Sequence, residues 1–442
     1  MKNPRETMRR LAKYRISNKI SPISPDTLAK LKDAINQRNS ASSHLNDASI
    51  SEINAREGIE PYLYNGDVLL TDEQINHQLS VNNIKGRMIR QASTVYNKWT
   101  NNEIFYYFDK NFPLKKRDLV EKALSILEEV TCAKFKQNST SKNRIRVFQG
   151  NGCFATIGML GGEQELSLGR GCHSIGTIQH EFLHAIGIWH EHMRSDRNDY
   201  LTIDLSDVSL SKQYNFDKLN ERVSQNFIDF DYASVMHYPA AVFTNNNTVS
   251  MYTINQEFQF TIGMKQLAFS DIYKINQFLN CTANCPEPLL SCDNQGFVNS
   301  NGCDRCICSK GFAGRICDQR PDDEGLTLVV GASWLNFTVT IGNSSNKNEA
   351  RTEYTYKTLW FRVPQRMTLQ VKVVDLKMTQ CQFSCPFAGV EIKYGKNRML
   401  GGPVTCCESQ LNQIFSSTND PTAIIFYNNY YESKFTISYR II

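Results

Sequence analysis

The sequence predicts an α+β domain, followed by a small disulfide-rich module and a C-terminal all-β sandwich. Between residues 91 and 282, helical and strand-like patterns mix without a regular alternation of strand and helix. Six cysteines fall within residues 285–317, and from about residue 325 short alternating apolar segments recur without a helical pattern. We therefore expect four parts: a leader (residues 1–90), the α+β domain (91–282), the disulfide-rich module (283–318) and the sandwich (325–442).

The composition is that of a globular protein of about three domains. The chain has 442 residues, of which 41% are hydrophobic and 21% charged. Its 49 Lys and Arg residues exceed its 44 Asp and Glu residues by only five, and no run of five basic residues occurs, so we expect no nucleic-acid partner. The sequence has no apolar stretch of about 18 residues, and we therefore expect no membrane span.

The leader is polar, basic at its start and free of cysteine. Apolar residues recur at helical spacing over residues 21–37, which predicts a helix, and a linker rich in Ser and Asn follows. Further along, Asn65-Gly66 marks a turn, and the basic stretch KGRMIR closes the leader at residues 85–90.

Three elements of the α+β domain can be assigned from their patterns. The segments IFYYFD (residues 104–109) and RIRVFQG (144–150) read as strands, whereas RDLVEKALSILEEVT (117–131) reads as an amphipathic helix. Apolar and aromatic side chains become frequent here, so the core is expected to begin in this region.

The 14 cysteines indicate an oxidising compartment. Residues 285–317 are too short and too rich in glycine to bury an adequate core, so disulfides are expected to stabilise them. Five glycosylation sequons, of which chance would produce one or two, agree with secretion: Asn138, Asn246, Asn280, Asn336 and Asn343. The basic N-terminus lacks the apolar core of a signal peptide, which a start site further upstream would explain. We give the cysteines more weight and expect a secreted, extracellular protein.

Five of the eight histidines lie within residues 173–192, and three of them have the spacing of metal ligands. His180 and His184 are four residues apart, hence on one face of a helix. Gly187 can end that helix and turn the chain, which brings His190 back as a third imidazole. Three neutral nitrogen ligands leave zinc a position open for water, and Glu181 is placed to take the proton of that water.

The length of this motif decides against the alternative of satisfied histidines on a surface helix. HExxH alone arises by chance, whereas HEFLHAIGIWH also requires a glycine and a third histidine at fixed positions. Three of the other histidines, His173, His192 and His237, are expected at the surface or behind the ligands.

Residues 180–197, HEFLHAIGIWHEHMRSDR, together with SVMHY at 234–238, resemble the signature and the Met-turn of the astacin family of metzincin metallopeptidases. The resemblance implies a metzincin catalytic domain over residues 91–282. It also implies that Met236 packs beneath the zinc and that Tyr238 is a movable ligand, which leaves the metal when substrate binds and stabilises the oxyanion.

The resemblance extends to the C-terminal parts, as an EGF-like domain (283–318) and a CUB-like domain (325–442), in the order typical of secreted nematode astacins. It implies these disulfides: Cys132–Cys281, Cys153–Cys172, Cys285–Cys303, Cys292–Cys306 and Cys308–Cys317. In the CUB-like part the spacing of Cys385 and Cys406 fits the family, whereas Cys381 and Cys407 are placed unusually.

In the leader, Tyr64-Asn65-Gly66-Asp67 resembles the FxGD element of astacin propeptides, although the same four residues could form only a polar turn. The resemblance implies that Asp67 ligates zinc in the latent form. Tyr64 replaces the family's phenylalanine, which we expect to be tolerated if its hydroxyl reaches solvent. An activating protease is expected to cleave after Arg87 or Arg90, and the new N-terminus near Gln91 would turn toward Glu191.

The sequence thus predicts a secreted zinc endopeptidase, made as a zymogen, with one zinc ion per subunit and a zinc-bound water activated by Glu181. Its expected partners are extracellular protein or peptide substrates. One alternative is a catalytically inactive adhesion protein that functions through its EGF-like and CUB-like modules. The intact histidine motif disfavours it. The other is a zinc enzyme of different chemistry, such as an amidase, which the Met-turn and the modular tail disfavour.

Overall fold

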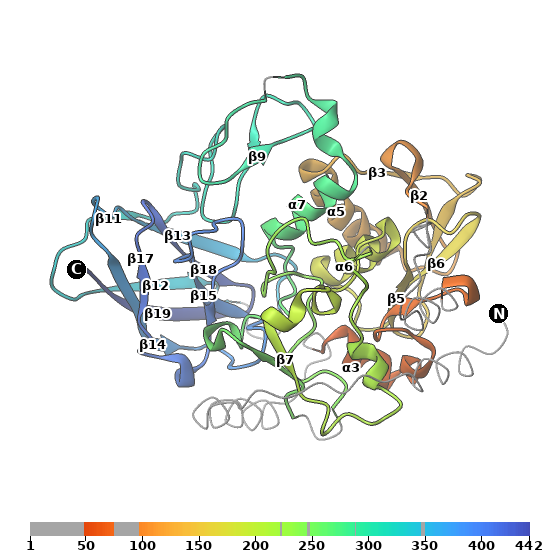
Figure 1. Cartoon of the computed structure of the whole chain (residues 1–442), viewed down its shortest axis with the longest axis horizontal. Helices are drawn as coiled ribbons and strands as arrows, with labels where there is room; N and C mark the ends of the chain where they lie inside the picture. The colour runs from red at the N-terminus through yellow and green to blue at the C-terminus, as the bar shows by residue number, and fades with distance from the viewer. Residues whose placement is uncertain (1–47, 75–96, 222, 245–247, 288, 346–349) are drawn as a thin grey trace.

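The structure, a computed structural model, describes residues 48–74, 97–221, 223–244, 248–287, 289–345 and 350–442. The helix expected over residues 21–37, the cleavage sites Arg87 and Arg90, Gln91 and the sequon at Asn246 lie outside these ranges. Figure 1 shows the sandwich on one side of the molecule and the α+β domain on the other, with the disulfide-rich module at their junction.

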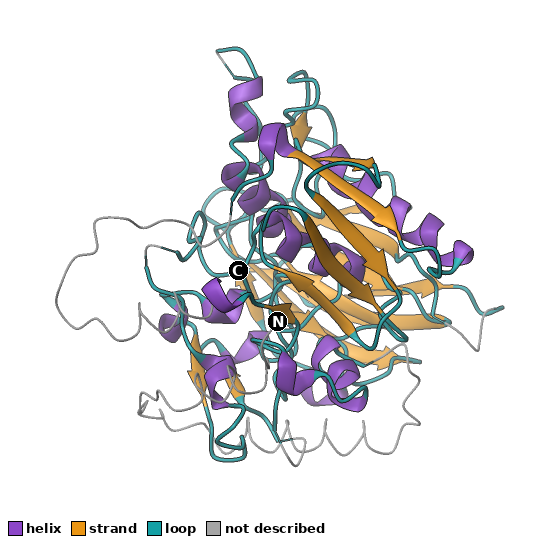
Figure 2. Ribbon diagram, turned by 90° about the vertical axis from the view of Figure 1, so that its right-hand side faces the viewer, coloured by secondary structure: helices purple, strands orange, loops and turns teal. Residues whose placement is uncertain are grey.

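A six-stranded sheet carries the first half of the α+β domain. Its order is β1-β5-β6-β4-β2-β3, and all neighbours are parallel except β5 and β6. Helices α5 (Leu114–Val130) and α6 (Ile175–Ile186) pack on each other and bury apolar side chains in one core with the sheet. Figure 2 shows helices lying against strands on the side of the molecule that faces the viewer. The strands are β1 (Val68–Leu69), β2 (Glu103–Phe108), β3 (Lys134–Gln137), β4 (Arg144–Phe148), β5 (Cys153–Thr156) and β6 (Glu163–Leu168).

The three elements predicted for this domain are present as β2, β4 and α5. Helix α5 begins at Leu114, earlier than predicted, because the Lys and Arg residues of its first turn favour a helix without adding to its apolar pattern. Helix α3 (Ile50–Arg56) was not predicted. Ser49 and Glu52 form a capping box at its start, which is the sequence signal that would have located it.

The second half of the domain is mostly irregular. It holds the antiparallel pair β7 (Leu201–Ile203) and β8 (Met251–Thr253), and helix α7 (Phe269–Phe278). At the start of α7, the carboxylate of Asp271 accepts hydrogen bonds from Ser234 Oγ (2.5 Å) and Val235 N (2.8 Å). The turn at residues 234–238 is therefore fixed to this helix.

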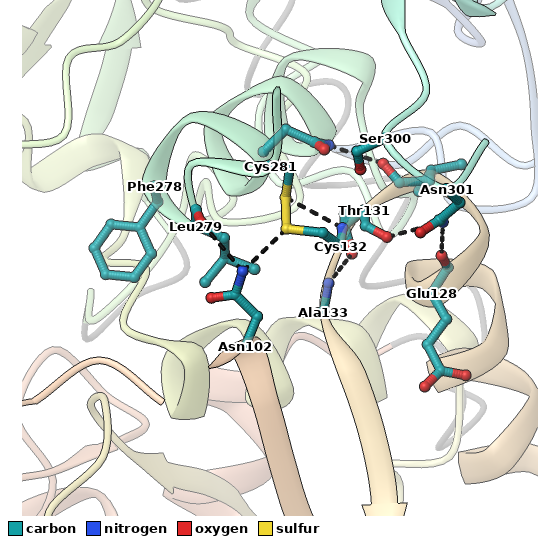
Figure 3. Close-up of a disulfide and its surroundings, with 12 residues drawn as sticks. Asn102, Glu128, Thr131, Cys132, Ala133, Phe278, Leu279, Cys281, Ser300 and Asn301 are labelled. Atoms are coloured by element: carbon teal, nitrogen blue, oxygen red, sulfur yellow. Dashed lines mark hydrogen bonds between the residues drawn. A yellow bond between two sulfur atoms is a disulfide. The ribbon is translucent and has the colours of Figure 1, made fainter. Parts of the chain in front are cut away.

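The disulfide-rich module contains one short hairpin, β9 (Phe297–Val298) with β10 (Cys306–Ile307). Figure 3 shows how the module meets the end of α5 beside the Cys132–Cys281 disulfide. The side-chain Nδ2 of Asn301 donates to the carbonyl oxygens of Glu128 and Thr131. These are carbonyls that the last turn of a helix leaves without partners, so the module caps α5.

Two sheets form the C-terminal sandwich, as predicted, and enclose an apolar core of their own. Their neighbouring strands are antiparallel except for β11 and β13, which are parallel. One sheet has the order β11-β13-β18-β15-β16 and the other β12-β19-β14-β17. Strands β16 and β17 were not predicted because neither lies in a run of alternating apolar residues. The strands are β11 (Thr327–Leu328), β12 (Leu335–Gly342), β13 (Thr355–Phe361), β14 (Leu369–Lys377), β15 (Ala388–Ile392), β16 (Val404–Thr405), β17 (Phe415–Ser417), β18 (Thr422–Asn428) and β19 (Glu432–Ile441).

All 14 cysteines are paired, in seven disulfides. Five of these have the partners implied by the resemblance, and the remaining two are Cys381–Cys407 and Cys385–Cys406. Within the described ranges, no helix combines the length and the apolar character needed to cross a bilayer.

Candidate metal centre

Helix α6 carries the first two histidines, and both are buried. Ser174 caps its N-terminus by accepting from Thr177 N (3.1 Å), and Gly187 ends it with a φ of 125°, which a residue with a side chain rarely adopts. His180 and His184 lie one turn apart on this helix, and both are at most 2% exposed. The bend at Gly187 is what allows the chain to return toward them.

The Nε2 atoms of His180, His184 and His190 lie 3.1–3.2 Å from one another. Nδ1 of His180 faces the carbonyl oxygen of Val235, and Nδ1 of His184 that of Ile188, each at 2.8 Å. Because a carbonyl only accepts, these two Nδ1 atoms carry the protons and their Nε2 lone pairs point at one another. Tetrahedral zinc with Zn–N bonds of about 2.0–2.1 Å would hold such nitrogens about 3.3 Å apart. The three imidazoles therefore fit zinc.

A carboxylate from the leader completes this group. Asp67 is fully buried; its Oδ2 lies 3.1 Å from Nε2 of His180, and its Oδ1 lies 3.4 and 3.2 Å from Nε2 of His184 and His190. Burial raises the pKa of Asp67, but the imidazoles of His190 and His184 outweigh it and hold that pKa well below its ordinary value. Three nitrogens and one oxygen within 4.8 Å of one another form a donor set that zinc takes.

The backbone around Asp67 fixes this carboxylate. Strand β1 adds to the sheet edge in parallel with β5, pairing Val68 with Ala155. Asn54, which is fully buried, donates from Nδ2 to the carbonyl oxygens of Gly66 and Cys153 and accepts from Cys153 N, each at 2.7 Å. One side chain thereby ties the leader to the edge of the sheet.

Gly66 is required where the leader enters the site. Its φ is 86°, and a Cβ at this position would lie 2.9 Å from both the hydroxyl of Tyr238 and Cζ of Phe243. The Tyr238 hydroxyl itself lies 2.6 Å from Asp67 Oδ2 and 2.5 Å from the carbonyl oxygen of Asn65, and its one proton can be donated to either. Tyr238 thus already reaches an oxygen held among the three histidines.

Tyr64 departs from the expectation stated for it. Its ring is buried, stacked on Tyr214 and edge-on to Trp189, and burial raises the pKa of its phenol. The hydroxyl therefore does not reach solvent, and the replacement of phenylalanine is accommodated inside the core instead. The ring of Tyr64 is buried because it packs between Tyr214 and Trp189, and no local sequence pattern predicts that contact.

Glu181 lies beside the histidines with both carboxylate oxygens buried and without a hydrogen-bond partner among the described residues. Burial, and to a lesser extent the charge of Asp67, raises its pKa well above the ordinary value. Burying a carboxylate without a hydrogen-bond partner costs free energy of folding. A group that binds at this centre could supply the missing partner. Met236, from the turn at 234–238, is buried in the same core as α6.

The remaining histidines and Glu191 have distinct places. His192 and His237 are buried, and Nε2 of His192 lies 2.7 Å from Oδ1 of Asn65, so His192 contacts the leader. His173 is half-buried and lies outside the metal group. The carboxylate of Glu191 accepts from Asp231 N (3.0 Å) and Arg194 (3.1 Å) and pairs with Lys274. Sequence reasoning gave no role to Asn54 or Asp271, because neither belongs to a local motif.

Comparison with known proteins gives consistent matches. Residues 91–280 match the family model described as Astacin (Peptidase family M12A). The chain is similar to zinc metalloproteinase nas-32 of Caenorhabditis elegans, with 38% identity over 88% of this chain and 60% of that protein. It is also similar to zinc metalloproteinase nas-17 of the same species, with 33% identity over 89% of each. Among solved structures, the hatching enzyme zinc-protease high choriolytic enzyme 1 of the medaka fish Oryzias latipes shares 31% identity over 42% of this chain and 94% of its own, with a TM-score of 0.39.

The metal site predicts the effect of removing one ligand. His184→Ala should lose most of the zinc, because two imidazoles and a carboxylate bind the ion far more weakly than the complete set. His173→Ala, in the same region but outside the group, should retain one zinc ion per chain. Elemental analysis after dialysis measures both. Equal zinc content in the two variants would contradict this assignment of the ligands.

Proposed function

The chain belongs to the astacin family of zinc peptidases, and we propose on this basis that it is a zinc-dependent endopeptidase, made as a zymogen and secreted, that cleaves extracellular proteins. The observation that supports this most strongly is the pairing of two features in one buried site. Three imidazole nitrogens converge within 3.2 Å, and the carboxylate of Glu181, the residue after the first of these histidines, is buried without a hydrogen-bond partner among the described residues. A structural zinc site would need no such carboxylate.

In the proposed reaction, the zinc ion supplies Lewis acidity that polarises the scissile carbonyl and lowers the pKa of water. His180, His184 and His190 bind the metal, and the carbonyl oxygens of Val235 and Ile188 hold two of their rings in orientation. Glu181 accepts the proton of the attacking water and passes it to the amine that leaves. Glu181 thus acts first as a general base toward the water and then as a general acid toward the leaving amine.

We propose that the Tyr238 hydroxyl donates a hydrogen bond to the carbonyl oxygen of the substrate. This oxygen gains negative charge as its carbon becomes tetrahedral. In the structure, the Asp67 carboxylate stands in for that oxygen, and the Tyr238 hydroxyl lies 2.6 Å from it. A donor already at this distance needs little rearrangement to stabilise the charge. The role of Tyr238 is therefore electrostatic.

We assign latency to the leader. Asp67 fills the position among the three histidines, and β1 covers the edge of β5, where an extended substrate could otherwise pair. Cleavage after Arg87 or Arg90 would release both contacts. The new N-terminus near Gln91 would then approach Glu191, whose buried carboxylate is already balanced by Lys274 and Arg194.

The proposed domain limits are those of the sequence prediction: a propeptide (1–90), a peptidase domain (91–282), an EGF-like domain (283–318) and a CUB-like domain (325–442). Seven disulfides support secretion, because thiols are kept reduced in the cytosol. The order of pairing in the small module, first with third, second with fourth and fifth with sixth, supports the EGF-like assignment. We assign binding of substrate or matrix to these two modules.

The first prediction concerns the carboxylate of Glu181. Glu181→Ala should bind one zinc ion and fold normally, yet lose about 10²–10⁴-fold in turnover, because it lacks the group that moves the proton. Glu129→Gln, which changes an exposed carboxylate on α5, serves as the control and should retain full activity. Cleavage of gelatin by the trimmed protein measures both. Near-normal turnover by zinc-loaded Glu181→Ala would exclude this mechanism.

The second prediction separates binding from catalysis at Tyr238. Tyr238→Phe removes one donor from a charge that develops only during reaction, so the activation barrier should rise by about 2.7–4 kcal/mol and kcat should fall about 10²–10³-fold, while KM changes little. Tyr232→Phe also removes a hydroxyl that donates a hydrogen bond, to the carbonyl oxygen of Tyr200, but away from the metal group. It should leave kcat unchanged. A rise in KM alone would make Tyr238 a substrate-binding residue instead.

The third prediction concerns latency. The uncleaved protein should contain zinc and be inactive, whereas uncleaved Asp67→Ala should cleave substrate, because the site then admits water. Asp72→Ala removes an exposed carboxylate from the same leader and should stay latent. Activity is measured with the leader shown intact by mass spectrometry. If the intact wild-type protein is as active as the trimmed one, Asp67 does not act as a switch.

A further inference from the structure

The sandwich reaches the α+β domain through the β15–β16 connection, which comprises residues 393–403. Gly401 N donates to both carboxylate oxygens of Asp231, each at 3.2 Å. Asn397 Nδ2 donates to Oδ2 of Asp229 at 3.0 Å. Both aspartates lie within five residues before the turn at 234–238, so the connection contacts the segment that leads into Met236 and Tyr238.

Asp231 relays this contact to the metal centre. It is buried, its carboxylate also accepts from Ala233 N at 2.9 Å, and its own N–H donates to Glu191 Oε1 at 3.0 Å. Glu191 follows His190 in the chain, and its N–H donates to the carbonyl oxygen of Met236 at 2.9 Å. Between the sandwich and the third histidine there are thus only two side chains, each held by hydrogen bonds.

The contact is also sterically tight. A Cβ added at Gly401 would lie 2.3 Å from Cβ of Ala233, one residue before the turn. Real Cβ atoms do not approach so closely, so either the connection or Ala233 must be displaced by such a change. In contrast, a Cβ at Gly395 in the same connection would meet no atom within 4 Å.

A broader interface holds the connection in place. Val404 N donates to Thr261 Oγ1 at 3.0 Å, and Ser384 Oγ donates to the carbonyl oxygen of Ile262 at 2.9 Å. Apolar side chains of both parts share one core that includes Phe260 and the Cys385–Cys406 disulfide. The sandwich therefore cannot shift without disturbing the α+β domain.

We propose that the β15–β16 connection of the sandwich positions the metal centre. Gly401 and Asp231 would hold Glu191 and the turn at 234–238 in fixed positions relative to each other. The sandwich is then a part of the catalytic unit as well as a binding module. Gly401 and Asp231 do not touch the reacting atoms, so they are positioning residues. The inference rests on the metal centre of the proposed function but does not require that the reaction be peptide hydrolysis.

Zinc binding by the full, uncleaved chain tests this proposal. Gly401→Ala should weaken zinc binding about 10-fold or more, as measured by competition with a chelator of known affinity, because residues that orient ligands contribute about 10–100-fold. It should also alter the visible spectrum of the cobalt-substituted protein. The matched control, Gly395→Ala, should stay within about twofold of the wild type and leave the spectrum unchanged.

The outcomes separate positioning from a general loss of stability. If Gly401→Ala lowers the melting temperature but binds zinc and cobalt like the wild type, the proposal is wrong. Should Gly401→Ala fail to fold, Asn397→Ala decides, with an expected weakening of zinc binding of about 10-fold, the lower end of that range, and an affinity within about twofold of the wild type as the contrary result. A wild-type protein without peptidase activity would overturn the proposed function but leave the zinc comparison intact.

Discussion

The convergence of three imidazoles on one point in a dry interior is the constraint on which the rest of this structure depends. Lone pairs 3.1–3.2 Å apart repel one another, and burial deprives them of water, so the protein must hold them by other contacts until a cation binds. Those contacts come from separate parts of the chain: helix α6, the bend at Gly187, and the carbonyl oxygens of Ile188 and Val235. The site is therefore a property of the domain and not of one helix.

The leader exploits the same constraint. Asp67 brings the negative charge that a cation bound by the three imidazoles favours, and the fixed position of β1 on the edge of the sheet delivers it there. Asn54 makes this arrangement specific, since its amide satisfies the carbonyl oxygen of Gly66 and both polar groups of Cys153. A leader with the aspartate alone would lack this hold on the backbone.

The C-terminal modules are attached by hydrogen bonds to polar groups of the α+β domain. Asn301 caps the end of α5, and Gly401 adds a donor to the carboxylate of Asp231, which also accepts from Ala233 and Ser270. Helix ends need such partners and a buried carboxylate can accept several donors, so both modules contribute to the polar contacts of the domain. This is why the modules pack on the domain as they do, instead of being joined only by linkers.

The sequence by itself determined the parts that depend on local spacing. The four-residue separation of His180 and His184, the glycine at 187 and the third histidine predicted a metal group, and alternation of apolar residues predicted the sandwich. Strands β16 and β17 lie outside any such pattern. The five disulfide pairs and the place of Asp67 followed from resemblance, since spacing alone leaves many pairings open.

Tertiary contacts, by contrast, bury Tyr64, tie the leader to the sheet through Asn54, and hold the turn at 234–238 through Asp231 and Asp271. These contacts join residues from 12 to 170 positions apart, and no local pattern encodes which buried polar group will meet which partner when the chain folds.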